Sequence, residues 1–129
     1  MARWVSWNKN PAQKSVGDCA VRAVSIALAL DWDTAYSLIA AEGFRLKDMP
    51  SSNAVFGAVL RQNGFTRHII PNTCPECYTI GDFADEHPHG IYVVGTGNHV
   101  VTIKDGVVLD SWDSRNESPV YYWHKEGVQ

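Results

Sequence analysis

The sequence predicts an α+β fold, with helices in the first half of the chain and an antiparallel sheet in the second. Two observations support this prediction. Between residues 18 and 62, apolar segments lie between residues that typically begin and end helices. After residue 64, short β-rich segments alternate with turn residues. The chain has 129 residues, 45% of them apolar, so we expect one domain, residues 1–129, with a core that needs no disulfides.

The first helix is expected to be the centre of the fold. Residues 1–17 are polar and irregular, and we expect an ordered loop there. Asp18 is a good N-cap type, and the segment from there to residue 30 is apolar almost all round. Its polar residues, Arg22 and Ser25, share one narrow stripe. The helix is therefore expected to be buried on most of its faces.

Two further helices and five strands complete the prediction. A helix is expected over 33–42, capped by Asp33 and ended by Gly43, and another over 52–62, capped by Ser51 or Ser52. We expect the strands at 66–70, 91–94, 99–104, 107–112 and 120–124, and a loop at 71–90. The pair Asp105-Gly106 is a strong signal for a tight hairpin turn between two of these strands.

Composition excludes several classes of function. Eleven Lys and Arg residues against fourteen Asp and Glu residues give a net charge of −3, so no basic surface for nucleic acid is expected. No apolar run approaches the roughly 18 residues of a membrane span. The first residues lack the apolar core of a signal peptide. We therefore expect a cytoplasmic protein with no nucleic-acid or membrane partner, in which the three cysteines are free thiols.

Cys19 is the first candidate for chemistry, because it falls in the first turn of the expected buried helix. The unpaired backbone N–H groups and the dipole at that end stabilise a thiolate, the nucleophilic form of cysteine. The alternative is that Cys19 is a small buried apolar side chain. A nucleophilic cysteine needs a base, and His99 is the histidine that opens a strand next to a loop.

The hairpin supplies a geometric test of a partner for His99. With a two-residue turn at 105–106, His99 faces Trp112, and Asp110 is the diagonal neighbour of His99 on the same face of the sheet. We favour Asp110 over Asp113, which a register slip of one residue would bring to that face. Trp112 is expected either to exclude water from the His–Asp pair or to belong to the core.

Three short motifs together resemble the papain-like cysteine peptidases. The segment GDCAVRAV at 17–24 is similar to the cysteine-bearing start of that family's central helix. The segment NHVV at 98–101 is similar to its histidine strand, and DSW at 110–112 to its Asn-Ser-Trp motif, with Asp110 in place of asparagine. More narrowly, most of the chain resembles small uncharacterised papain-like proteins of bacteria and their prophages.

The resemblance implies a papain-like fold and a catalytic triad in the order cysteine, histidine, aspartate. Cys19 would be the nucleophile, and His99 the general base and acid. Asp110 would fix the tautomer of His99, and Trp112 would shield that pair.

The resemblance also implies an oxyanion hole. In the family, a glutamine six residues before the cysteine completes it together with the backbone N–H of the cysteine. The matching position here is Gln13. Asn8, Asn10 or the backbone of Asp18 are the alternatives.

A second group of residues has the composition of a metal site. Cys74 and Cys77 form a C-x-x-C unit, and His87 and His89 follow it. These four residues could hold zinc, but the second half of such a site is normally C-x-x-C or H-x₃₋₅-H rather than H-x-H. A redox pair and two free thiols are the alternatives, and we favour free thiols. No cofactor is expected.

The function that these observations predict is a thiol hydrolase that cleaves a peptide, isopeptide or other amide bond in a peptide or protein substrate. An acyltransferase would use the same site if another amine, rather than water, resolved the acyl-enzyme. The alternative is a catalytically silent papain-fold binding or inhibitor protein of prophage origin. A zinc-stabilised interaction module ranks third.

Overall fold

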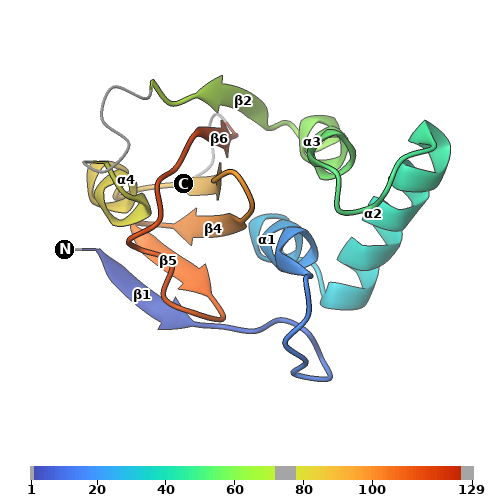
Figure 1. Ribbon diagram of the computed structural model, residues 1–129, viewed down its shortest axis with the longest axis horizontal. Coiled ribbons are helices and arrows are strands. Elements are labelled where there is room, and N and C mark those ends of the chain that lie inside the picture. The colour runs from blue at the N-terminus through green and yellow to red at the C-terminus, as the bar shows by residue number, and fades with distance from the viewer. Residues whose placement is uncertain (1, 72–77, 126–129) are drawn as a thin grey trace.

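The computed structural model describes residues 2–71 and 78–125 (Figure 1). Its elements in chain order are β1 (Arg3–Ser6), α1 (Cys19–Ala27), α2 (Trp32–Leu46), α3 (Asn53–Gln62), β2 (Thr66–Ile69), α4 (Ile80–Glu86), β3 (Ile91–Gly95), β4 (Val100–Lys104), β5 (Val107–Asp110) and β6 (Tyr121–His124). The described residues thus form an α+β fold with four helices and one six-stranded sheet.

The sheet is mixed rather than wholly antiparallel. Its strand order is β1-β5-β4-β3-β6-β2, and every neighbouring pair is antiparallel except β1 and β5, which run parallel. The prediction of an antiparallel sheet is therefore correct for five strands and wrong for β1. The first strand lies at the sheet edge beside β5 and runs in the same direction. Most of the chain separates these two strands, so no tight hairpin turn imposes an antiparallel pairing on them.

Two elements were missed by the sequence prediction. The expected loop at 1–17 contains β1, whose four residues are too few for a clear alternation of apolar and polar side chains. The expected loop at 71–90 contains α4. A local signal for α4 was present, because Thr79 and Asp82 have the spacing of a capping box. In the structure the Thr79 hydroxyl accepts from the Asp82 backbone N–H, and the Asp82 carboxylate accepts from that of Thr79.

Helix ends differ from the prediction where loops fold back on the helices. α2 is capped by Asp31, not Asp33, because the Asp31 carboxylate accepts a 2.7 Å bond from the Thr34 N–H. It continues past Gly43, which was expected to end it, to a left-handed Lys47. Gly43 is required inside the helix for another reason: a Cβ there would lie 2.9 Å from the Asp48 carbonyl oxygen.

The other two predicted helices are confirmed with small changes. Ser52 caps α3, as one of the two expected residues. α1 begins at Cys19, directly after Asp18, but ends at Ala27, and Ala29 already has a left-handed backbone with φ 55°. Eight of the nine residues in α1 are buried, which confirms a central helix that is buried on most faces.

The sheet separates two hydrophobic clusters. One face is covered by α1, α2 and α3 and includes Val93, while the other carries α4 and includes Val94 (Figure 1). Adjacent residues of β3 therefore point to opposite faces, as the pleat requires. α1 packs against β4 and β3 on one side and against α2 and α3 on the other. The start of α1 is thus held close to the start of β4.

The hairpin register is confirmed. Lys104 pairs with Val107 and Thr102 with Leu109. Asp105 and Gly106 have φ values of 50° and 77°, as a type I′ turn requires at both central positions. β5 ends at Asp110, two residues before the expected end of the strand at residue 112.

Among the described residues, no single helix is long and apolar enough to cross a membrane. Only α1 and α2 taken as a pair, bent by 112° at their junction, meet the length and composition requirement.

Gly95 gives a test of the sheet packing. A Cβ at this position would overlap the ring of Tyr121, the cross-strand partner, whose side chain is buried. We expect Gly95→Ala to lower the free energy of unfolding by roughly 1–3 kcal/mol, measured by urea denaturation. Gly97→Ala is the control, because no atom lies within 4 Å of its Cβ position. Equal stability of the two variants would contradict the packing described here.

Candidate active site

Cys19 is the first residue of α1 and is only partly buried. Asp18 occupies the N-cap position, but its side chain accepts no hydrogen bond from the first turn, so the predicted side-chain cap is wrong. The Asp18 carboxylate accepts from the Arg22 guanidinium instead, because a charge-assisted hydrogen bond is stronger than one to a neutral backbone N–H. The backbone N–H groups at the start of α1 therefore stay without a side-chain cap beside the thiol.

The surroundings of Cys19 favour the thiolate. Burial raises the pKa of the Cys19 thiol, but a hydrogen bond with His99, one from the Val100 backbone N–H, and the positive charges of His99 and Arg22 outweigh it. The net pKa lies below the ordinary value. The expectation that Cys19 is merely a small buried apolar side chain does not match this polar environment.

His99 lies between the thiol and a carboxylate. Its Nε2 is 2.7 Å from Asp110 Oδ2, which leaves Nδ1 as the ring nitrogen for the hydrogen bond with Cys19. Burial lowers the pKa of His99, but the hydrogen bonds and charges of Asp110 and Cys19 raise it to about 9. Of the two carboxylates weighed from the sequence, Asp110 contacts His99, whereas Asp113 pairs with Arg115.

Asp110 is held in one orientation by contacts to both carboxylate oxygens. Oδ2 accepts from His99 and, at 2.7 Å, from the Ser114 hydroxyl. Oδ1 accepts from the Ser111 backbone N–H and from Arg22. Burial raises the pKa of Asp110, but these donors lower it below its ordinary value. The carboxylate therefore stays charged although its residue is only 2% exposed.

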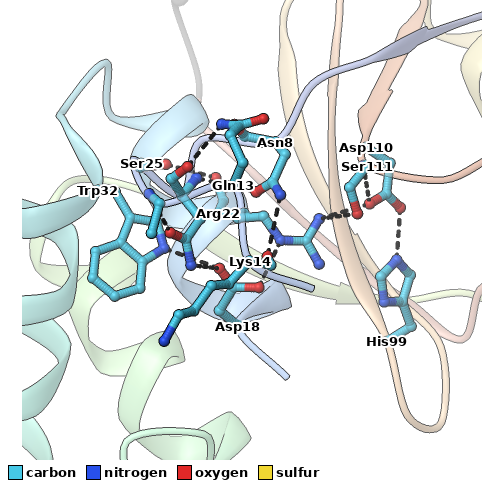
Figure 2. Close-up of polar contacts among 12 residues, drawn as sticks. Asn8, Gln13, Lys14, Asp18, Arg22, Ser25, Trp32, His99, Asp110 and Ser111 are labelled. Carbon is cyan, nitrogen blue, oxygen red and sulfur yellow. Dashed lines mark hydrogen bonds and ion pairs between the residues drawn. The ribbon is translucent and has the colours of Figure 1, made fainter. Parts of the chain in front are cut away.

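Arg22 was not recognised from the sequence as part of the site. Its guanidinium lies between two acidic residues, with Nε 2.9 Å from Asp18 Oδ1 and Nη1 2.9 Å from Asp110 Oδ1 (Figure 2). A signal was available in the sequence: an arginine in a helix expected to be buried almost all round needs buried anionic partners. The sequence did not show which acidic residues those are.

Trp112 lies beside the candidate triad as predicted. Its ring centroid is 4.7 Å from that of His99, at an interplanar angle of 44°. The side chain is 42% exposed, so the alternative that Trp112 belongs to the core is wrong. Trp112 covers one side of the imidazole and keeps its outer surface in contact with solvent.

Gln13 is not directed at the site. Its side-chain amide donates to the backbone carbonyls of Asn8 and Asn10, at 2.9 and 2.8 Å, and it does not line the cleft. The prediction from the six-residue spacing between Gln13 and Cys19 is therefore wrong. The backbone at Gln13 is left-handed, with φ 55°, and it turns the side chain back into its own loop. Of the alternative donors, Asn10 and Asp18 line the cleft. The Asn10 amide donates to Asp18 Oδ2, and the Asp18 backbone N–H donates to the Val16 carbonyl oxygen, so the structure directs neither at the thiol.

The cleft has a volume of about 650 Å³ and reaches Cys19 and His99. Its walls come from the segment before α1, the first turns of α1, α2 and α3, and the loop between β3 and β4. Ten of the 21 lining residues are apolar or aromatic: Pro11, Ala12, Val16, Ala20, Val21, Trp32, Tyr36, Pro50, Phe56 and Val100. These residues offer apolar contact area to a molecule bound in the cleft.

The zinc hypothesis stays untested. Cys74 and Cys77 lie outside the described residues. Of the other two expected ligands, His89 is exposed, and His87 holds its Nδ1 2.7 Å from the Phe83 carbonyl oxygen. Within residues 2–71 and 78–125, no group of three or more His, Cys, Asp or Glu side chains is arranged to hold a metal ion.

Comparison of the chain with protein-family models, with curated proteins and with solved structures gives no match. The resemblance to papain-like peptidases stays a prediction, and the functional argument below depends on the geometry of the site.

The carboxylate partner of His99 can be tested by NMR. Because Asp110 stabilises the protonated ring, we expect Asp110→Asn to lower the pKa of His99 from about 9 by at least about one unit. The measurement is a titration of the imidazole nitrogens by ¹⁵N chemical shift. Asp113→Asn is the matched control, since that carboxylate pairs with Arg115, and it should leave the His99 titration in place. An unchanged titration in Asp110→Asn would show that Asp110 does not support the imidazolium.

Proposed function

We propose that this protein is a papain-like thiol hydrolase that cleaves a peptide, isopeptide or other amide bond in a peptide or protein substrate. The observation that carries the proposal is one continuous set of contacts at the base of the cleft. The thiol of Cys19 at a helix N-terminus bonds the imidazole of His99, which bonds the buried carboxylate of Asp110. Nucleophile, base and orienting acceptor are the three parts that covalent amide hydrolysis by cysteine requires.

The first half of the reaction forms a thioester. The Cys19 thiolate attacks the substrate carbonyl carbon while His99 carries the proton on Nδ1. Negative charge develops on the carbonyl oxygen, and the uncapped backbone N–H groups at the start of α1 are the donors available to stabilise it. His99 then donates its proton to the leaving amine, the C–N bond breaks, and the acyl group remains on sulfur.

The second half regenerates the enzyme. His99, now neutral, removes a proton from water, and the water oxygen attacks the thioester carbon. The C–S bond then breaks, the carboxylic acid is released, and the Cys19 thiolate leaves beside a His99 that keeps the proton. Asp110 keeps Nε2 of the ring occupied throughout, so Nδ1 always faces the reacting atoms. An amine in place of water would give acyl transfer by the same steps.

The cleft supports a substrate class. Its apolar and aromatic walls favour a polypeptide with large apolar side chains near the bond that is cleaved. The net charge of −3 gives no electrostatic reason to expect a nucleic-acid substrate. A reduced thiol is required for the reaction, which fits a cytoplasmic protein.

The pH dependence of turnover follows from the two pKa directions. The reactive form has Cys19 deprotonated and His99 protonated, and it exists above the lowered pKa of Cys19 and below the pKa of about 9 of His99. We expect a bell-shaped profile of kcat/KM against pH for hydrolysis of an apolar peptide amide. Its upper limb should lie near pH 9. An upper limb that does not move in Asp110→Asn would contradict the assignment to His99.

Alkylation of Cys19 tests the nucleophile directly. We expect iodoacetamide to modify Cys19 with a pH midpoint well below the ordinary value of about 8.5 for cysteine, read by mass spectrometry of the Cys19 peptide. In His99→Ala, the midpoint should move up toward that ordinary value, because the imidazolium no longer stabilises the thiolate. His68→Ala is the control, since His68 contacts Thr66 and Tyr122 on β2 and β6 rather than the cleft.

The same experiment separates the enzyme from a silent binding protein on the same fold. A midpoint near 8.5 in the wild-type protein, unchanged in His99→Ala, would refute the hydrolase. It would leave the alternative of a binding or inhibitor protein that tolerates Cys19→Ala.

A further inference from the structure

Arg22 is a buried cation that connects two parts of the candidate site. It is 8% exposed and contacts Asp18 at the N-cap of its helix and Asp110 on β5, which is 88 residues further along the chain. Its Nη1 also donates to the Ser111 hydroxyl at 3.0 Å. A fork of guanidinium donors that spans two carboxylates in fixed directions is a geometry that lysine does not reproduce.

The contact with Arg22 decides which oxygen of Asp110 faces His99. Arg22 and the Ser111 N–H hold Oδ1, so Oδ2 is left for His99 and the Ser114 hydroxyl. Rotation of the carboxylate about its last bond would break the contacts of both oxygens at once. The guanidinium therefore fixes the orientation of the group that orients His99.

A chain of contacts leads from the thiol back to α1. Cys19 is hydrogen-bonded to His99, His99 to Asp110, and Asp110 to Arg22. Figure 2 shows the contacts of Asp110 with His99 and Arg22. Arg22 lies three residues after Cys19, on the same side of α1. One helix thus carries both the thiol and the anchor of the carboxylate that contacts His99.

Asp18 balances the charge of Arg22. Its Oδ1 accepts from Arg22, and its Oδ2 accepts from the indole N–H of Trp32 at 3.0 Å and from the Asn10 amide at 3.3 Å. The positive charge of the Arg22 guanidinium is therefore shared between the carboxylates of Asp18 and Asp110. Without Asp18, the whole positive charge would act on Asp110 and weaken its attraction for the protonated His99.

We propose that Arg22, held by Asp18, is the positioning residue of this site: it fixes Asp110 against His99 and couples that pair to Cys19 through α1. The inference rests on the proposed thiol hydrolase and adds a residue that the Cys-His-Asp triad does not include. The ionisable groups around the thiol that bear on the test come from several elements. They are Asp18 at the N-cap of α1, Arg22 from α1, His99 before β4, Asp110 from β5, Tyr121 from β6, and Lys14 in the cleft wall.

The test compares Arg22→Met with wild type by the pH midpoint of Cys19 alkylation. We expect the midpoint to rise by about one pH unit, because the nearby positive charge is lost and the carboxylate is free to turn away from His99. Arg22→Lys should give an intermediate midpoint, since it keeps the charge but not the fork. Arg45→Met is the matched control. Arg45 also pairs with a buried carboxylate on its own helix, that of Glu42, but this pair lies outside the cleft. The midpoint of Cys19 alkylation in Arg45→Met should therefore equal that of wild type.

A purely structural role for Arg22 predicts a different result. The melting temperature would fall, but folded Arg22→Met would keep the wild-type midpoint, and that result would overturn the proposal. If Arg22→Met does not fold, Asp18→Asn is the second test of the role of Arg22, because this substitution removes the charge of Asp18 but keeps the shape of its side chain. We then expect a lower pKa of His99 by ¹⁵N titration, and an unchanged pKa would overturn the proposal.

Failure of the proposed function itself gives another pattern. In that case wild type already alkylates with an ordinary midpoint, and His99→Ala makes no difference. A low wild-type midpoint that depends on His99 but not on Arg22 would leave the hydrolase in place and remove only the role of Arg22.

Discussion

The charged carboxylate of Asp110 inside the protein is the constraint on which the site depends. A carboxylate buried to this degree is stable only if donors surround it, and here they come from four directions: an imidazole, a hydroxyl, a backbone N–H and a guanidinium. Its backbone carbonyl is engaged as well, by the indole N–H of Trp4 and the N–H of Trp7. The same contacts hold β5, α1 and the segment after β1 together, so the site and the fold share one set of interactions.

Helix α1 gives the thiol its environment in two ways. Its N-terminus presents uncapped N–H groups beside Cys19, and its second turn supplies the buried positive charge of Arg22. Both effects oppose the desolvation that burial imposes on a thiolate. The helix can remain in place with a charged residue inside it because Asp18 and Asp110 neutralise the guanidinium from opposite sides.

Local signals predicted much of the fold and the centre of the site. The turn at 105–106 set the register of the hairpin, and the register brought His99 and Asp110 to the same face. Capping and apolar patterns located the helices to within a few residues. Two of the features predicted wrongly are β1 and the end of α2. The strand β1 is only four residues long, too short for a clear pattern. The end of α2 depends on a loop that packs against Gly43.

By itself, the sequence determined the α+β class, the hairpin register, and the placement of His99 and Asp110 on one face of the sheet, because each of these follows from local geometry. Only the tertiary structure decided the parallel edge strand, the partners of Arg22, and the direction of Gln13. These features depend on how a loop turns or on groups far apart in the chain, such as Arg22 and Asp110. A buried charge indicates that partners exist, but the packing of α1 against the sheet selects them.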